Sequence, residues 1–125
     1  MNIKSGTIKA MKYTLTKGAD IPKKDKFGIH LSILPNFDNC GIVVVETEVG
    51  HNQEFYDKQS SFNYFILEGS GTFFLDDEGV SVVNGDLLSV QPNVRIYYKG
   101  NLKMILITSP AWKPENEVET KPSIW

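Results

Sequence analysis

A run of short apolar segments punctuated by glycines, from Gly41 to Pro110, constrains the fold of this chain more than any other feature. The centre of this block, residues 64–71, reads Tyr-Phe-Ile-Leu-Glu-Gly-Ser-Gly, and the turn Gly85-Asp86 follows it. β-Branched and aromatic residues recur at short intervals with turn residues between them, and helical periodicity is almost absent. Such a pattern is typical of an all-β sandwich or barrel.

Alternation of apolar and polar side chains marks the expected strands, because successive side chains of a strand point to opposite faces. We expect strands at residues 11–15, 27–34, 42–49, 62–67, 72–75, 80–83, 87–90, 94–98 and 102–108. The Asp-Asp-Glu-Gly stretch between residues 75 and 80 predicts a hairpin. Turns are expected at residues 69–71 and 84–86, an irregular segment at 50–61 and a polar tail at 111–125.

The length of 125 residues predicts one domain, large enough to bury roughly two-thirds of its unfolded surface. We divide it into N-terminal strands at 1–40, a barrel at 41–110 and a C-terminal tail at 111–125. The net charge of −2 is too small to indicate a nucleic-acid or membrane partner. Cys40 is the only cysteine, which excludes an intramolecular disulfide and a zinc site built on several cysteines.

The N-terminus lacks the apolar core of a signal peptide, because lysines interrupt residues 1–19. No window approaches the ~18 continuous apolar residues that span a bilayer, so we expect a cytoplasmic protein. Residues 1–26 contain seven lysines against two aspartates. These lysines could form an anion-binding face, or they could protect an edge strand from pairing with another chain.

The glycine frame resembles that of the cupin superfamily, whose members are double-stranded β-helix or jelly-roll barrels. The first cupin motif, G-x5-H-x-H-x3-4-E-x6-G, matches Gly50 and Gly69 with the correct spacing. Its three metal-ligand positions fall on Tyr56, Lys58 and Phe62. The resemblance therefore implies the cupin fold without the ligands that metal-binding cupins carry at these positions.

The second cupin motif, G-x5-P-x-G-x2-H-x3-N, anchors on Gly85. Its glycine position falls on Asn93, which can also adopt a left-handed conformation, and its histidine position falls on Ile96. The segments 98–103 and 110–112 are similar to those of a group of small single-domain bacterial cupins that is mostly uncharacterised. The resemblance indicates the fold rather than the activity, because this fold hosts many functions.

Cupin motif residues point into the barrel, and alternation along the strands extends this inward set. The resemblance therefore implies an aromatic and aliphatic lumen that binds a small organic ligand. The expected ligand-binding residues are Tyr56, Lys58, Phe62, Tyr64, Ile96 and Tyr98. We expect no cofactor and no metal, because transition metals require several converging imidazole or carboxylate ligands.

Three residues are weak catalytic candidates. Tyr64 and Tyr98 could donate hydrogen bonds or transfer protons, or they could be core tyrosines. His51 could be a general base at the barrel mouth, or it could simply be exposed. Lys58 could hold an anionic ligand, or its ammonium group could extend to water.

A different metal site is the alternative for the remaining polar residues. It would combine one of the two histidines with nearby carboxylates: His51, His30, Glu46, Glu48 and Glu54. Arg95 is expected to point outward into a surface salt bridge. Asp86 is expected to cap a turn by accepting a backbone hydrogen bond rather than to act in catalysis.

These observations predict a metal-independent protein that binds a small polar organic molecule, such as a carbohydrate, in the barrel lumen. An alternative is a sugar or sugar-nucleotide isomerase or epimerase, and a metal-dependent cupin enzyme is a third hypothesis. Whether the chain is an enzyme stays open at this point. A homodimer is expected, because the N-terminal strands or an outer sheet face could pair with a second copy.

Overall fold

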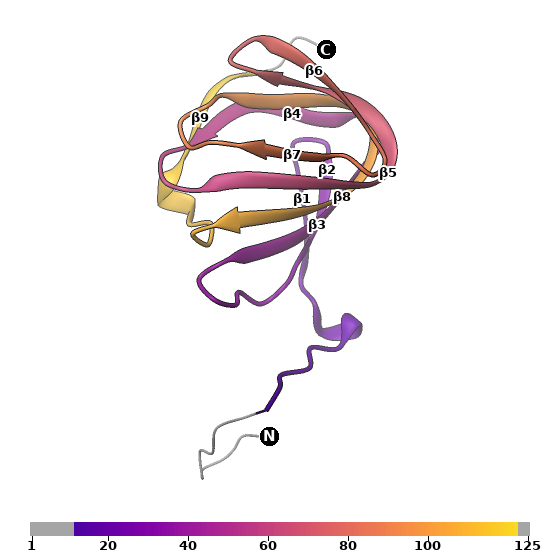
Figure 1. Ribbon diagram of the computed structural model, residues 1–125, viewed down its shortest axis with the longest axis vertical. Helices are drawn as coiled ribbons and strands as arrows, with labels where there is room; N and C mark the ends of the chain where they lie inside the picture. Colours follow the sequence, from indigo (N-terminus) through magenta and orange to yellow (C-terminus); the bar gives the residue numbers. More distant parts are fainter. Residues whose placement is uncertain (1–11, 123–125) are drawn as a thin grey trace.

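The computed structural model describes residues 12–122, most of which lie in β-strands (Figure 1). The strands are β1 (Lys23–Lys26), β2 (Ile29–Ile33), β3 (Gly41–Thr47), β4 (Gly50–Asp57), β5 (Ser61–Leu75), β6 (Glu78–Val83), β7 (Leu87–Val90), β8 (Ile96–Ser109) and β9 (Glu117–Pro122). Two short 3₁₀ turns are η1 (Gly18–Asp20) and η2 (Pro114–Asn116). No helix among the described residues is long and apolar enough to cross a membrane.

The strands pair antiparallel in one curled sheet, in the order β1-β2-β3-β8-β4-β9. β5 pairs with β8 along most of its length and also carries β6 and β7. β8 changes partner along its course, from β4 near its start to β3 over its second half. This exchange bends the sheet round so that one face encloses the interior (Figure 1). The predicted all-β barrel architecture is thereby confirmed.

The turns at the tip and base of the β5–β6 hairpin form as expected. Asp76 and Asp77 connect the two strands and both have positive φ (49° and 72°), the backbone conformation that a two-residue hairpin turn requires. In the next turn, the carboxylate of Asp86 accepts a hydrogen bond from the backbone N–H of Val83 at 2.8 Å. Asp86 therefore has the capping role that the sequence predicts.

The prediction of a turn at residues 69–71 is wrong, because β5 runs through this segment without interruption. Gly69 has a φ of +95°, and a Cβ atom at this position would collide with the carbonyl oxygen of Asn101 on β8. The pairing register between the two strands shifts nearby, between Ile66 and Glu68. Glycine is therefore needed here for a bend and a close approach within paired strands, not for chain reversal.

The N-terminal segment also differs from the expected pattern. Residues 12–16 lie outside any strand, and Met11, with the rest of residues 1–11, lies outside the described residues. The strand expected at 27–34 is shorter and begins at Ile29, because Phe27 and Gly28 have positive φ and form the turn between β1 and β2. The apolar alternation continues across this turn and conceals it. β1 is an edge strand that carries three lysines, in keeping with edge protection.

Two polar strands, β4 and β9, lie where irregular chain was expected, and they pair with each other. Their polar side chains bind across the pair: the amide of Gln53 donates to the carbonyl of Lys121 at 3.1 Å, and the hydroxyl of Thr120 donates to Glu54 at 2.7 Å. Mutual hydrogen bonding thus replaces the apolar alternation that usually marks a strand. The strands expected at 94–98 and 102–108 are one continuous strand, β8.

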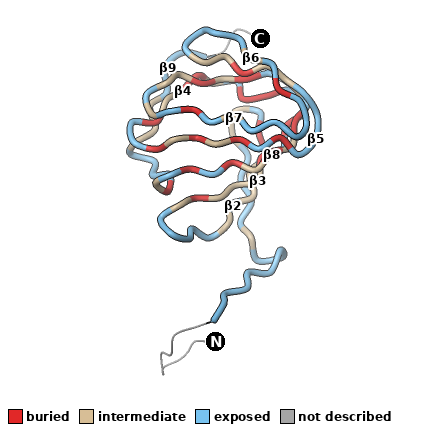
Figure 2. The backbone as a smooth tube through the Cα atoms, viewed as in Figure 1, coloured by how far each residue is buried: buried red, intermediate tan, exposed pale blue. Residues whose placement is uncertain are grey.

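Buried residues alternate with exposed ones along the strands (Figure 2), and the buried apolar side chains form one core cluster on the inner face of the curled sheet. Aromatic rings are prominent among them: Phe55, Phe62, Tyr64, Phe73 and Tyr98. Burial of each large apolar side chain contributes roughly 1.5–3 kcal/mol. This shared inner face holds the curl together and surrounds the candidate site.

Candidate functional site

The curled sheet encloses a cavity of about 130 Å³. Aliphatic side chains of β2 and β3 form one wall, and aromatic side chains of β4, β5 and β8 form the opposite part of the lining. An apolar cavity of about 150 Å³ can hold a molecule the size of benzene. The interior can therefore accept one ring of a ligand, and the rest of a larger ligand would extend toward the mouth.

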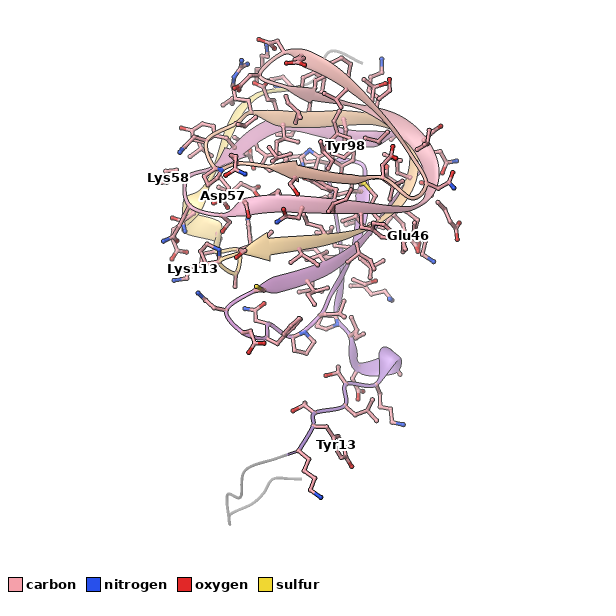
Figure 3. All side chains as sticks on the ribbon, viewed as in Figure 1. Tyr13, Glu46, Asp57, Lys58, Tyr98 and Lys113 are labelled. Atoms are coloured by element: carbon pink, nitrogen blue, oxygen red, sulfur yellow. The ribbon has the colours of Figure 1, made fainter. Side chains whose placement is uncertain are left out.

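His51, Tyr64 and Tyr98 meet in this cavity from three different strands. Tyr98 on β8 lies directly opposite His51 on β4 in the strand register, and their ring centroids are 5.7 Å apart. The ring centroids of Tyr64 and Tyr98 are 5.9 Å apart in an edge-to-face arrangement. Figure 3 shows Tyr98 within the curl of the sheet. Near its start β8 pairs with β4 on one side and with β5 on the other, which brings the three strands together.

Burial determines the protonation states of these three side chains. His51 is only 3% exposed, and burial, with the nearby positive charge of Lys26, lowers its pKa to about 4. The backbone N–H of Gln53 lies within hydrogen-bonding distance of its Nδ1 at 3.4 Å. Burial also raises the pKa values of Tyr64 and Tyr98. Near pH 7 the site therefore presents a neutral imidazole and two protonated phenols.

The mouth of the cavity carries an ion pair between strands that are distant in sequence. Lys26 on β1 and Glu117 on β9 approach to 3.4 Å between Nζ and Oε2. The indole N–H of Trp112 donates to the other carboxylate oxygen of Glu117 at 2.9 Å, and the ammonium of Lys26 lies 5.3 Å from the centroid of the Trp112 ring. All three side chains line the cavity, so they add charge and hydrogen-bonding groups to an otherwise apolar lumen.

The structure places the expected ligand-binding residues in different environments. Phe62, Tyr64 and Tyr98 line the cavity. Ile96 is buried in the core but does not reach the cavity surface. The role of these four residues in ligand binding stays a prediction.

The predicted inward orientation of Tyr56 and Lys58 is wrong. Tyr56 is half-buried where β4 pairs with β9, and Lys58 is exposed at the rim of the barrel (Figure 3). Neither lines the cavity. The alternation extended back from Phe62 does not continue through residues 58–60, which lie outside any strand, and His51 and Phe55 of β4 line the lumen instead.

The sequence pattern did not identify Lys26, Trp112 and Glu117 as a group. Lys26 was one of many N-terminal lysines, and Glu117 belongs to a tail that was expected to be irregular. The lysine excess in residues 1–26, which could indicate an anion-binding face, was the one available signal. The meeting of these residues depends on the pairing of β9 with β4, which local patterns do not show.

The alternative metal sites are not assembled. His30 contacts Asp25 at 2.9 Å and Glu48 at 3.3 Å on the exposed surface, where the two carboxylates raise its pKa. Glu54 is buried against Arg95 at 3.1 Å rather than near His51. Within residues 12–122, no group of three histidine, cysteine, aspartate or glutamate side chains is arranged to hold a metal ion. Arg95 also contacts Asp77 at 3.0 Å, the outward salt bridge that was predicted.

Solved structures identify the class of protein to which this fold belongs. No family model and no functionally curated sequence matches the chain. Pac13 from Streptomyces, described as a nucleoside dehydratase, is 34% identical, with a TM-score of 0.85 over 91% of this chain and 95% of that chain. KdgF from Halomonas sp. is 14% identical, with a TM-score of 0.69 over 83% of this chain and 98% of that chain. An RmlC-like cupin from Shewanella frigidimarina is 18% identical, with a TM-score of 0.60 over 79% and 88%.

The chain belongs to the cupin superfamily. The similarity to Pac13 is the more specific observation. Three Pac13 structures with uridine carry a single substitution, one of histidine by glutamine and two of tyrosine by phenylalanine. The intervals between those substituted positions are 13 and 34 residues, and the same intervals separate His51 from Tyr64 and Tyr64 from Tyr98.

Proposed function

We propose that this protein binds a nucleoside in the barrel lumen and catalyses the removal of water from its sugar. The observation that carries the proposal is the meeting of His51, Tyr64 and Tyr98 around one cavity, at the sequence intervals found for the substituted residues of Pac13. The proposal refines the expected carbohydrate-like ligand to one that joins a sugar to an aromatic base.

The shape and lining of the cavity favour such a ligand. Its volume of about 130 Å³ suits a single ring, and the aromatic walls can pack against the flat face of a base. The sugar would then lie between the base and the mouth, beside His51 and next to the charged and polar groups of Lys26, Glu117 and Trp112. A few directed polar groups in a mostly apolar lining are typical of small-molecule sites.

The protonation states permit proton transfer. Loss of water from a sugar requires one group to accept a proton from carbon and another to assist the departing hydroxyl. His51 is neutral above about pH 4 and can accept a proton. To accept a proton at Nε2, the neutral imidazole must carry its own proton on Nδ1. In that tautomer Nδ1 no longer accepts the long 3.4 Å hydrogen bond from the backbone N–H of Gln53. The phenols of Tyr64 and Tyr98 stay protonated and can donate hydrogen bonds to the leaving hydroxide, which departs as water when it takes the proton that His51 accepted from carbon.

We propose that the reaction proceeds without a metal ion. The lumen presents one imidazole and one carboxylate, His51 and Glu117, whereas transition-metal sites use several such ligands converging on one point. Elemental analysis of the purified protein, before and after dialysis against a chelator, tests this proposal. A stoichiometric transition metal whose removal abolishes turnover would contradict it.

The activity is tested by incubating the protein with nucleosides and following the loss of one water by mass spectrometry. The panel includes nucleosides with a carbonyl group on the sugar, because a neighbouring carbonyl makes the C–H bond more acidic. We expect His51→Gln, Tyr64→Phe and Tyr98→Phe each to reduce turnover by about 10²-fold or more.

Two matched variants control for non-specific effects. His30→Gln changes the exposed histidine, and Tyr97→Phe changes the neighbour of Tyr98 that stacks on Phe74 with centroids 4.7 Å apart, away from the cavity lining. Both should retain full turnover. Binding of nucleosides without any conversion would reject the dehydratase activity and leave a binding protein.

A further inference from the structure

The titratable groups at the lumen have an excess of positive charge. The residues that line the cavity include six with ionisable side chains: Lys24, Lys26, His51, Tyr64, Tyr98 and Glu117. His51 and the two tyrosines are neutral near pH 7 because of their burial. Glu117 pairs with Lys26. One positive charge, that of Lys24, is left over at the lumen of a chain whose net charge is −2.

Both cavity-lining lysines, Lys24 and Lys26, lie on β1. Lys24 and Lys26 are two residues apart, so they share one face of the strand and are separated by about 7 Å. In the register with β2 they pair with Leu31 and Ile29, which also line the cavity. Lys26 is partly buried and neutralised, whereas Lys24 is exposed and makes no ion pair with any described residue.

We propose that the ligand of this lumen carries an anionic group, a phosphate or a carboxylate, which Lys24 binds at the mouth. The inference rests on the proposed function and specifies the substrate class as a nucleoside with an anionic substituent on its sugar. A single uncompensated cation beside a low-dielectric cavity attracts anions and orients them as they enter. The base then occupies the apolar interior, and the charged end of the ligand stays at the edge strand, in water.

Calorimetric titration with three probes of the full chain tests the inference: uridine, uridine 5′-monophosphate and uridine 5′-carboxylate. At low ionic strength we expect one or both anionic probes to bind about three- to tenfold more tightly than uridine, as an exposed charge pair allows. A gain confined to the monophosphate identifies phosphate as the preferred group, and a gain confined to the carboxylate identifies carboxylate. High salt should remove the gain.

Lys24→Gln should abolish the preference for the anionic probes and leave the affinity for uridine unchanged. Lys23→Gln is the matched control, because Lys23 is the adjacent residue on the opposite face of β1, where it donates to Ser32 at 3.1 Å, and it does not line the cavity. Equal affinity for all three probes, or a preference that survives in Lys24→Gln, overturns the inference and leaves the proposed function standing. Failure of all three probes to bind overturns both.

Discussion

Lys26 and Glu117 join the first and last strands of the curled sheet through an ion pair of 3.4 Å, although 91 residues separate them in the sequence. The two strands are the edges of the sheet path, so this pair closes the curl at the mouth of the lumen. The ammonium group of Lys26 also helps to lower the pKa of His51.

Glu117→Gln should destabilise the fold by about 1–2 kcal/mol, because it leaves the partly buried ammonium of Lys26 without its counter-charge. Urea denaturation at pH 7 measures this change. Glu115→Gln, two residues earlier in η2 and exposed, is the control and should change stability by less than about 0.5 kcal/mol. Equal effects of the two substitutions would show that the ion pair does not stabilise the closure.

The stability of the protein should fall as the pH decreases from about 6.5 to about 4, in part through His51. Its pKa is about 4 in the folded chain against 6.5 in the unfolded chain, so the unfolded state binds more protons in this window. The contribution of His51 is fully present above pH 6.5 and is lost toward pH 4. The difference of about 2.5 pKa units corresponds to roughly 3 kcal/mol.

Denaturant titrations of the wild type and His51→Gln across this pH range isolate the effect of His51. The variant should lose less stability on acidification than the wild type. His30→Gln is the control of opposite sign, because the raised pKa of His30 contributes stability at low pH that is lost as the pH rises. Parallel profiles for the wild type and His51→Gln would contradict the buried, neutral state of His51.

Arg95→Met should destabilise the protein more than the loss of a fully exposed ion pair does, because it removes the charge partner of the buried carboxylate of Glu54. The double variant Glu54→Gln with Arg95→Met should recover part of this loss, and a double-mutant cycle measures the coupling. The exposed pair of Lys103 and Glu46 is the comparison, since Lys103→Met should cost at most about 1 kcal/mol. Simple additivity of the Glu54 and Arg95 changes would show that the pair is not coupled.

Asp86→Ala should reduce stability by about 0.5–1.5 kcal/mol without any change in ligand binding or turnover. The substitution removes the acceptor for the backbone N–H of Val83 in an exposed turn that does not contribute to the cavity lining. Thermal denaturation and the nucleoside assay together measure the two effects. A loss of turnover in a folded Asp86→Ala protein would show that the carboxylate has a catalytic role after all.

Local patterns in the sequence were sufficient for the features that depend on neighbouring residues. The hairpin around Asp76 and Asp77 and the capping role of Asp86 follow from turn chemistry, which operates over a few residues. The spacing of Gly50, Gly69 and Gly85 indicated the cupin barrel, and all three have positive φ in the structure, a conformation that glycine adopts without strain. Tyr64 and Tyr98 were placed correctly in the interior by strand alternation.

The tertiary structure alone decided what lines the lumen. Phe55 of β4 lines the lumen and Lys58 is exposed, because the alternation of β5 does not continue into β4 through residues 58–60, which lie outside any strand. The pairing of β9 then brought Glu117 to Lys26. The sequence therefore determined the barrel through short-range backbone preferences, whereas the charges at its mouth were decided by contacts between its most distant segments.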